Sequence, residues 1–230
     1  MENKRILLVF KFDGILLNTV ELYVKKIWSM LSAWQIIPSD VIEEKIDNLI
    51  ILNWDKNTRF LANLICHKIG APEYAAKLGR ELEGLDYSLA EDYRLNQDLM
   101  NMVGKMKNAD FQVALYTRRD LANLKYIARL VGLNLEIFDY LLTDDHLPAN
   151  RRVINPLLEL KAGHPGEIIY FGNTEEDASF CGQNIHCIIA PETNRRDGEN
   201  DIGEEGNFII DYLHSYLNTR KFSVKNEQLN

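Results

Sequence analysis

The chain has 230 residues, of which 46% are hydrophobic and 26% are charged, a composition typical of a globular protein with a sizeable core. Its net charge of −8 argues against a sequence-independent nucleic-acid binder and gives no attraction to anionic membranes. No apolar run approaches the roughly 20 residues of a membrane span, and the N-terminus lacks the features of a secretory signal. The three cysteines form no C-x-x-C pair, which is typical of free thiols. We therefore expect a cytoplasmic protein that binds neither nucleic acid nor membrane.

The first predicted element is a buried strand over residues 5–10, because these residues form the apolar run that parallel strands carry. From about residue 20 to residue 108, apolar side chains recur at helical spacing and no convincing strand is found. This block is too long for an ordinary connection between two strands. It therefore predicts an inserted helical cap.

Strands and helices alternate in the rest of the chain. Apolar runs predict further strands over residues 111–116, 138–143, 167–171 and 186–190, the second of them from the weakest pattern. Helical spacing predicts helices over residues 120–131, 174–183 and 207–217, with Gly132 ending the first. This alternation is typical of a doubly wound α/β fold.

The predicted organisation is therefore a Rossmann-like parallel sheet interrupted by a helical insertion. Residues 1–17 and 110–220 are expected to form the α/β core, and residues 18–109 the helical cap. Residues 221–230 are expected to form a tail.

Ligands of open α/β sheets bind beyond the carboxyl ends of the strands, so the residues after each predicted strand are candidates for a functional site. These are residues 11–14 (KFDG), residues 117–119 (TRR) and residues 172–177 (GNTEED). They place a hydroxyl, several cations and several acids at one edge of the sheet. Hydroxyl, backbone N–H and cationic groups together suit a phosphate. Within the second segment, Arg118 and Arg119 are more typical of a solvated pair than of an anion clamp.

In their order and spacing, these segments resemble the motifs of the haloacid dehalogenase superfamily, in the group of phosphoglycolate phosphatase and β-phosphoglucomutase. KFDGILLNT (residues 11–19) is similar to the first motif, D-x-D-G-T-L-x-[DN]-[ST]. VALYT (residues 113–117) resembles the second motif, which is a strand ending in Ser or Thr. FGNTEED (residues 171–177) resembles the fourth motif, which is G-D-x-x-x-D after a strand. The resemblance covers about residues 5–217. It implies a Rossmann-like core, a cap after the first motif, and Mg²⁺-dependent chemistry through an aspartyl-phosphate.

The departures from the family pattern fall on the residues that carry this chemistry. Lys11 stands where the family has its nucleophilic Asp, whereas Asp13 matches the second Asp, which acts as acid and base. Asn173 stands in place of the first acid of the fourth motif, and Asp177 matches the second. An ammonium group has no anionic oxygen with which to attack phosphorus. Because Mg²⁺ prefers carboxylate oxygens, we expect no cofactor and weak or absent Mg²⁺ binding, with Asp13 and Asp177 as the ligands of any metal that binds.

The resemblance also implies a third motif with a cation, and its position stays open. Counting along the chain places Arg151 or Arg152 there, or else residues 147–148 (Leu-Pro) with the cation lost. We prefer Arg151 because a phosphate site needs a cation. The residues expected to contact a phosphorylated ligand are then Thr117, Arg118, Arg151 and Asn173.

Lys11 is the central question of the sequence. Our hypothesis is that its ammonium group occupies the metal position and pairs with Asp13 and Asp177, because a buried lysine without a carboxylate partner is too unfavourable. The alternative is that Lys11 extends from the strand end to solvent and has no role.

Three functions follow from these residues. The first is a phosphatase-like protein that is catalytically impaired or inactive, a pseudoenzyme that binds a small phosphorylated ligand or a protein partner. The second is an active phosphohydrolase with a metal-poor site, in which Asp13 activates water and Lys11 stabilises the developing charge. The third is an interaction protein that acts through the surface of its cap.

Overall fold

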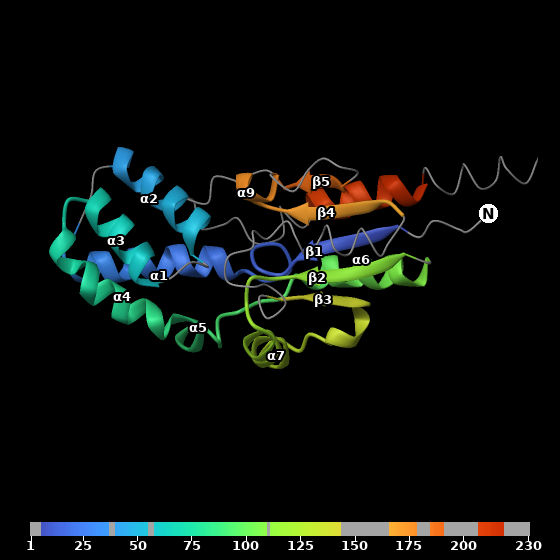
Figure 1. Ribbon diagram of the computed structural model, residues 1–230, viewed down its shortest axis with the longest axis horizontal. Helices are drawn as coiled ribbons and strands as arrows, with labels where there is room; N and C mark the ends of the chain where they lie inside the picture. The colour runs from blue at the N-terminus through green and yellow to red at the C-terminus, as the bar shows by residue number, and fades with distance from the viewer. Residues whose placement is uncertain are drawn as a thin grey trace, which may run out of the picture.

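The computed structural model describes residues 6–36, 40–54, 58–109, 111–143, 166–178, 185–190 and 207–218. Within these residues, the centre of the fold is a parallel sheet of five strands in the order β3-β2-β1-β4-β5 (Figure 1). All the strands predicted from the sequence are confirmed, and so is the Rossmann-like α/β class. The strands are β1 (Leu7–Lys11), β2 (Gln112–Tyr116), β3 (Tyr140–Leu142), β4 (Ile168–Gly172) and β5 (Ile185–Ile189).

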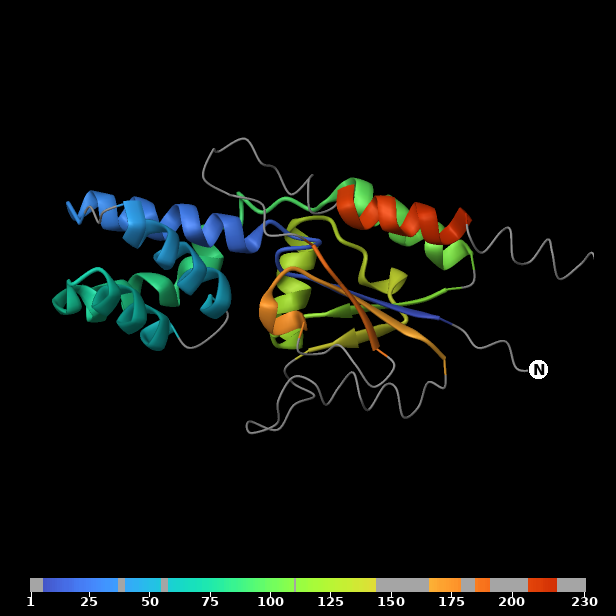
Figure 2. The ribbon, with the colours of Figure 1, turned by 90° about the horizontal axis from the view of Figure 1, so that it is seen from above.

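The central strand β1 is apolar on both sides because both of its faces are buried. Leu8 and Phe10 belong to one hydrophobic cluster, which includes residues of the helix over 207–218. Leu7 and Val9 belong to a second cluster on the opposite face. Figure 2 shows the 207–218 helix and α6 side by side over the sheet. The sequence of a strand buried on both faces is continuously apolar, rather than alternating between apolar and polar residues.

Between β1 and β2, the described chain is helical. Figures 1 and 2 show α1 to α5 grouped beyond the carboxyl ends of the strands, whereas α6 lies along the sheet. The predicted division into a core and a cap domain stays a prediction. The helices are α1 (Thr19–Ala33), α2 (Asp40–Asn53), α3 (Thr58–Lys68), the 3₁₀ helix η1 (Pro72–Tyr74), α4 (Ala75–Glu83), α5 (Leu85–Ser88) and α6 (Gln97–Asn108).

The segment before α1 and the segment after α5 are hydrogen-bonded to each other. Asn18 N donates to Arg94 O at 3.3 Å, and Arg94 N donates to Asn18 Oδ1 at 2.7 Å. Asn96 N donates to Leu16 O at 2.9 Å, and the Asn96 side chain caps α6. The helical block therefore leaves and rejoins the sheet at one place.

After β2, the predicted helix over 120–131 is confirmed as α7 (Leu121–Leu130), which Asp120 caps by accepting from Asn123 N at 2.7 Å. Gly132 follows its end with a φ of +71°. The predicted helix over 174–183 is seen as α9 (Glu175–Ala178), and its remainder lies outside the described residues. Among the described helices, none is long and apolar enough to cross a membrane. Residues 221–230, like Arg151 and Arg152, lie outside the described part of the chain.

Candidate functional site

The carboxyl ends of β1, β2 and β4 bring most of the predicted site residues together. The strand register pairs Lys11 with Tyr116 and Phe10 with Phe171, so the segments that follow these strands begin side by side. The predicted residues that the structure buries at this edge are Lys11, Asp13, Thr117, Asn173 and Asp177.

A tight turn directly after β1 positions Asp13. Gly14 N donates to Leu17 O at 2.8 Å, and Leu17 N donates back to Phe12 O at 2.9 Å. Gly14 has a φ of +84°, and a Cβ at this position would lie 2.2 Å from Asn173 Nδ2. Glycine is therefore required here both for its backbone conformation and for the close approach of the segment after β4.

Lys11 and Asp177 form a buried ion pair. Lys11 Nζ lies 2.8 Å from Asp177 Oδ2, and the side chains of the two residues are 10% and 4% exposed. The same carboxylate accepts from Tyr170 Oη and Thr174 Oγ1, each at 2.8 Å, and from the backbone N–H groups of Asn173 and Thr174. Burial alone would raise the pKa of Asp177, but the Lys11 charge and these hydrogen bonds hold it below its usual range.

The predicted pairing of Lys11 is therefore confirmed for Asp177, and the alternative of a lysine that extends to solvent is wrong. The expected second pair, with Asp13, differs from the structure. There the cation beside Asp13 is Arg119, whose Nε donates to Asp13 Oδ1 at 3.0 Å.

Two hydroxyl groups complete the surroundings of Asp13. Thr19 Oγ1, in the first residue of α1, donates to Asp13 Oδ1 at 2.9 Å. Thr117 Oγ1, directly after β2, donates to Asp13 Oδ2 at 2.8 Å. Both carboxylate oxygens thus already accept hydrogen bonds from the protein.

Arg119 joins the sheet edge to the helical block. Its Nη1 donates to Asp86 Oδ2 of α5 at 2.8 Å and to Asn123 Oδ1 at 2.9 Å. Its guanidinium carbon lies 5.4 Å from the centre of the Trp54 ring, after the end of α2. We call the two carboxylates of Asp13 and Asp86, together with the arginine between them, the Arg119 cluster.

The charges of the Arg119 cluster stabilise one another. Burial would lower the pKa of Arg119, but Asp13 and Asp86 raise it well above its usual value. Burial would raise the pKa of Asp86, but the nearby guanidinium lowers it. The hydroxyl groups of Tyr23 and Tyr93 also donate to Asp86 Oδ1, at 3.1 and 2.6 Å.

The predicted solvated pair at residues 118–119 is wrong for Arg119, whose side chain is only 6% exposed. Its backbone N–H donates to Thr117 Oγ1 at 3.2 Å, which fixes the turn after β2. Arg118, the arginine chosen from the sequence as a phosphate contact, is half-buried beside it. The roles of Arg118, Thr117 and Asn173 toward a ligand stay predictions, and Arg151 lies outside the described residues.

Sequence reasoning missed Asp86 altogether, and it placed Thr19 and Arg119 in candidate segments without giving either a contact in the site. Thr19 closes the first motif, KFDGILLNT, so its place in that motif is the signal that could have found it. Asp86 lies in a short helix of the insertion and belongs to no motif. Its role follows only from how α5 packs near the strand ends.

Two buried donors at this edge lack hydrogen-bond partners within the described structure. The side-chain amide of Asn173 makes no hydrogen bond through Nδ2 or Oδ1. The second donor is Nη2 of the Arg119 guanidinium group. A buried donor without a partner is unfavourable, so both groups are candidates to contact a ligand oxygen.

The two buried acids that follow β1 and β4, Asp13 and Asp177, each lie beside a cation of the protein. Among the described residues, no group of three or more His, Cys, Asp or Glu side chains could hold a metal ion. Asp177 faces Lys11 and Asp13 faces Arg119, so each carboxylate already has a cation of the protein beside it.

Comparison with known families identifies the class of protein that carries this arrangement. The haloacid dehalogenase-like hydrolase family matches residues 8–189, which covers the sheet except for Leu7, the first residue of β1. The chain therefore belongs to the haloacid dehalogenase-like hydrolases, a phosphatase-related family. None of the curated proteins compared with the sequence matches it.

Solved structures share the fold at low sequence identity. A predicted phosphoglycolate phosphatase from Haemophilus somnus 129PT has a TM-score of 0.59 at 14% identity, over 82% of this chain and 86% of that one. A protein assigned as a β-phosphoglucomutase from Thermotoga maritima has a TM-score of 0.55 at 14% identity, over 87% and 90%. CbbY from Rhodobacter sphaeroides, solved in complex with phosphate, has a TM-score of 0.53 at 16% identity, over 85% and 89%.

Proposed function

We propose that this protein is a non-catalytic member of its family, which acts by binding rather than by turnover. The observation that carries the proposal is the buried ion pair between Lys11 and Asp177, at 2.8 Å. The order of the motifs supports placing Lys11 at the position of the family's nucleophilic Asp. A lysine held at this position as an ammonium donor offers phosphorus no nucleophilic oxygen.

The donor set of the site does not fit Mg²⁺. Mg²⁺ needs oxygen ligands in near-octahedral geometry, and carboxylates supply most of its binding. Asp177 Oδ2 already accepts from Lys11, Thr174 and two backbone N–H groups, and Asp13 accepts from Arg119 and two threonines. A divalent cation would have to approach each carboxylate beside a protein cation, Lys11 or Arg119, whose charge repels it. We propose that Lys11 and Arg119 supply the positive charge that the metal supplies elsewhere in the family.

The active-enzyme alternative needs Asp13 to act as a base toward water. A base must have a lone pair free for the proton that it takes. Three donors, from Thr19, Thr117 and Arg119, occupy three of the roughly four lone-pair sites of the Asp13 carboxylate, which leaves at most one for a proton and disfavours that role. The geometry therefore favours the binding protein over the phosphohydrolase.

A phosphatase assay over a panel of phosphomonoesters in millimolar Mg²⁺ tests the proposal. We expect the wild-type chain to show no turnover above that of Asp13→Ala. Turnover in the wild type that Asp13→Ala abolishes would show an active enzyme and would overturn the proposal.

The unpartnered amide of Asn173 favours a second function, binding of a small phosphorylated ligand at the same edge. The amide and Arg119 Nη2 are both buried donors without a partner in the described structure. Titration with inorganic phosphate, followed by NMR of the backbone amides, tests this function. We expect shifts in residues 14–18 and 173–174 that Asn173→Leu removes, and a spectrum unchanged by millimolar phosphate would exclude it.

A further inference from the structure

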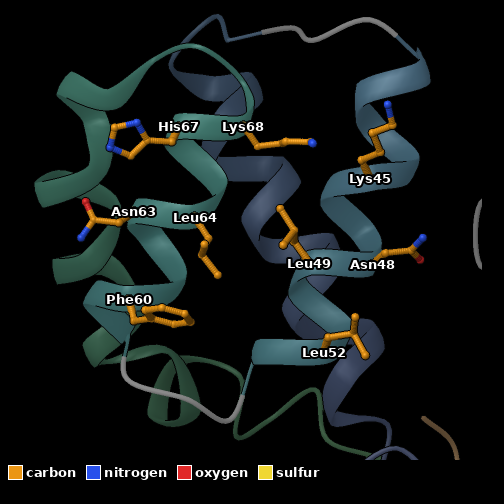
Figure 3. Close-up of a pocket in the computed structure, with 9 residues that line it drawn as sticks. All are labelled: Lys45, Asn48, Leu49, Leu52, Phe60, Asn63, Leu64, His67 and Lys68. Atoms are coloured by element: carbon orange, nitrogen blue, oxygen red, sulfur yellow. The ribbon is translucent and has the colours of Figure 1, made fainter. Parts of the chain in front are cut away.

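An open apolar groove lies between α2 and α3 (Figure 3). Its volume is about 730 Å³. We call it the α2–α3 groove. Its lining residues are Lys45, Asn48, Leu49, Leu52, Phe60, Asn63, Leu64, His67 and Lys68.

The groove exists because α2 and α3 each carry a second apolar stripe. Ile46 and Ile50 of α2 are buried in the core of the helical block, as are Leu61 and Ile65 of α3. The groove residues fall on a different side of each helix. They recur at helical spacing, as Leu49 and Leu52 on α2 and as Phe60 and Leu64 on α3.

These apolar side chains remain open to solvent. Leu52 is 37% exposed and Phe60 is 48% exposed, and the half-buried Leu49 and Leu64 lie between them and the charged end of the groove (Figure 3). Single exposed apolar residues are ordinary on a protein surface. Neighbouring ones that line a concave strip with a polar rim mark an interaction site.

One end of the groove is cationic although the whole chain carries a net charge of −8. Lys45 on α2 and Lys68 on α3 face each other across this end, and both are exposed (Figure 3). Among the side chains that the structure describes, none forms an ion pair with either lysine. The groove is therefore basic at one end and apolar at the other.

We propose that the α2–α3 groove receives an amphipathic helix of a partner protein, with apolar side chains on Leu49, Leu52, Phe60 and Leu64 and with acidic residues at the Lys45–Lys68 end. Lys45 and Leu52 are separated by two helical turns, or about 10 Å along α2. A partner helix of two to three turns therefore fills the strip with anchors at i, i+4 and i+7. This inference goes beyond the proposed function and does not depend on it, because an active enzyme could carry the same groove.

Other occupants fit the observations less well. A small apolar ligand is usually buried over most of its surface, whereas this groove is open along its length. Two copies of the chain would bring two concave strips together, and these cannot fill each other.

The test uses the full chain and a fluorescent helix-forming peptide with leucines at i, i+4 and i+7 and two glutamates beyond one end. The control peptide has lysines in place of the glutamates. Because the contact is small, we expect a Kd on the order of tens of micromolar for the acidic peptide by fluorescence anisotropy, and at least about 10-fold weaker binding of the control.

The variants separate the two parts of the groove. Lys45→Glu/Lys68→Glu should lose the acidic peptide and prefer the lysine peptide, whereas the matched charge control Lys105→Glu/Lys125→Glu, on α6 and α7, should bind as the wild type does. Phe60→Ser should weaken both peptides. All these side chains are exposed, so an unchanged unfolding midpoint confirms that each variant is folded.

Four results would overturn the proposal. The first is equal binding of the two peptides to the wild type, and the second is peptide binding that Phe60→Ser does not change. The third is a dimer in sedimentation experiments that Phe60→Ser dissociates, which would make a second copy the occupant. The fourth is binding of decanoate without binding of the acidic peptide, which would make the occupant a small amphiphile.

Discussion

Lys11 Nζ lies 2.8 Å from Asp177 Oδ2, although 166 residues separate the two in sequence. The pair forms because β1 and β4 are neighbours in the sheet and Asp177 lies only five residues beyond the end of β4. Lys11 thereby places a fixed positive charge at the carboxyl end of the central strand.

Replacing Lys11 by methionine should strongly destabilise the fold. Lys11→Met keeps the length of the side chain but leaves the carboxylate of Asp177 buried without its cation. Breaking a buried pair in this way costs about 3–5 kcal/mol in the free energy of unfolding. Urea unfolding followed by circular dichroism measures the change.

The double variant Lys11→Met/Asp177→Asn is the control, because it removes both charges. We expect it to lose less stability than the two single variants together, with a coupling of about 1–3 kcal/mol. Simple additivity of the two single effects would mean that the pair contributes nothing beyond the separate side chains.

Stability should fall in acid because Asp177 and Asp86 have lowered pKa values in the folded state. Their contribution is complete above the pKa of the unfolded chain, near 4, and is lost as the pH falls below it toward the folded values. Asp86→Asn cannot titrate at this position. The difference in the free energy of unfolding between the wild type and Asp86→Asn should therefore shrink from about pH 5 to about pH 2. A difference that stays constant over this range would show that the folded pKa of Asp86 is not lowered.

The Arg119 cluster should hold α5 against the sheet edge. Arg119→Ala leaves the buried Asp13 and the half-buried Asp86 without their cation, so we expect a loss of about 3–5 kcal/mol. Because Asp86 lies in α5, the backbone amides of α5 should also exchange with deuterium faster than in the wild type.

Arg129→Ala is the matched control, since this arginine of α7 is exposed and lies outside the cluster. Its effect should stay below about 1 kcal/mol and leave exchange in α5 unchanged. Equal effects of the two alanine variants would show that the cluster has no special role.

Cys66 should be unreactive in the folded protein. It is fully buried in α3, and burial, with a smaller effect of Glu73, raises its pKa to about 11. At pH 8, only about one molecule in a thousand then carries the reactive thiolate. Iodoacetamide should label Cys66 in urea but not in buffer, as read by mass spectrometry. Complete labelling of native Cys66 would contradict its burial.

The sheet was predictable from the sequence because parallel strands with two buried faces form continuous apolar runs such as residues 6–10. The residues at the strand ends followed from the same pattern, since all carboxyl ends of a parallel sheet meet at one edge. Lys11, Asp13 and Thr117 were found in this way. Strand order alone brings them together.

The pairing of charges within the site was not predictable in the same way. Arg118 and Arg119 are adjacent and chemically identical, and only the turn fixed by Thr117 Oγ1 decides which one points inward. Asp86 reaches that arginine because α5 packs near the strand ends, which no spacing in the sequence encodes. Once Arg119 pairs with Asp13, Lys11 is left with Asp177 alone.

The most direct test of the account is the thermal unfolding midpoint in millimolar Mg²⁺, measured for the wild type and for Lys11→Asp/Asn173→Asp, with NaCl at equal ionic strength as the control. A ligand that binds only the folded state raises the midpoint. We expect no Mg²⁺-specific rise for the wild type and a clear rise for the double variant, because the two new carboxylates face the edge that Lys11 now neutralises. A wild-type rise as large as that of the double variant would contradict it.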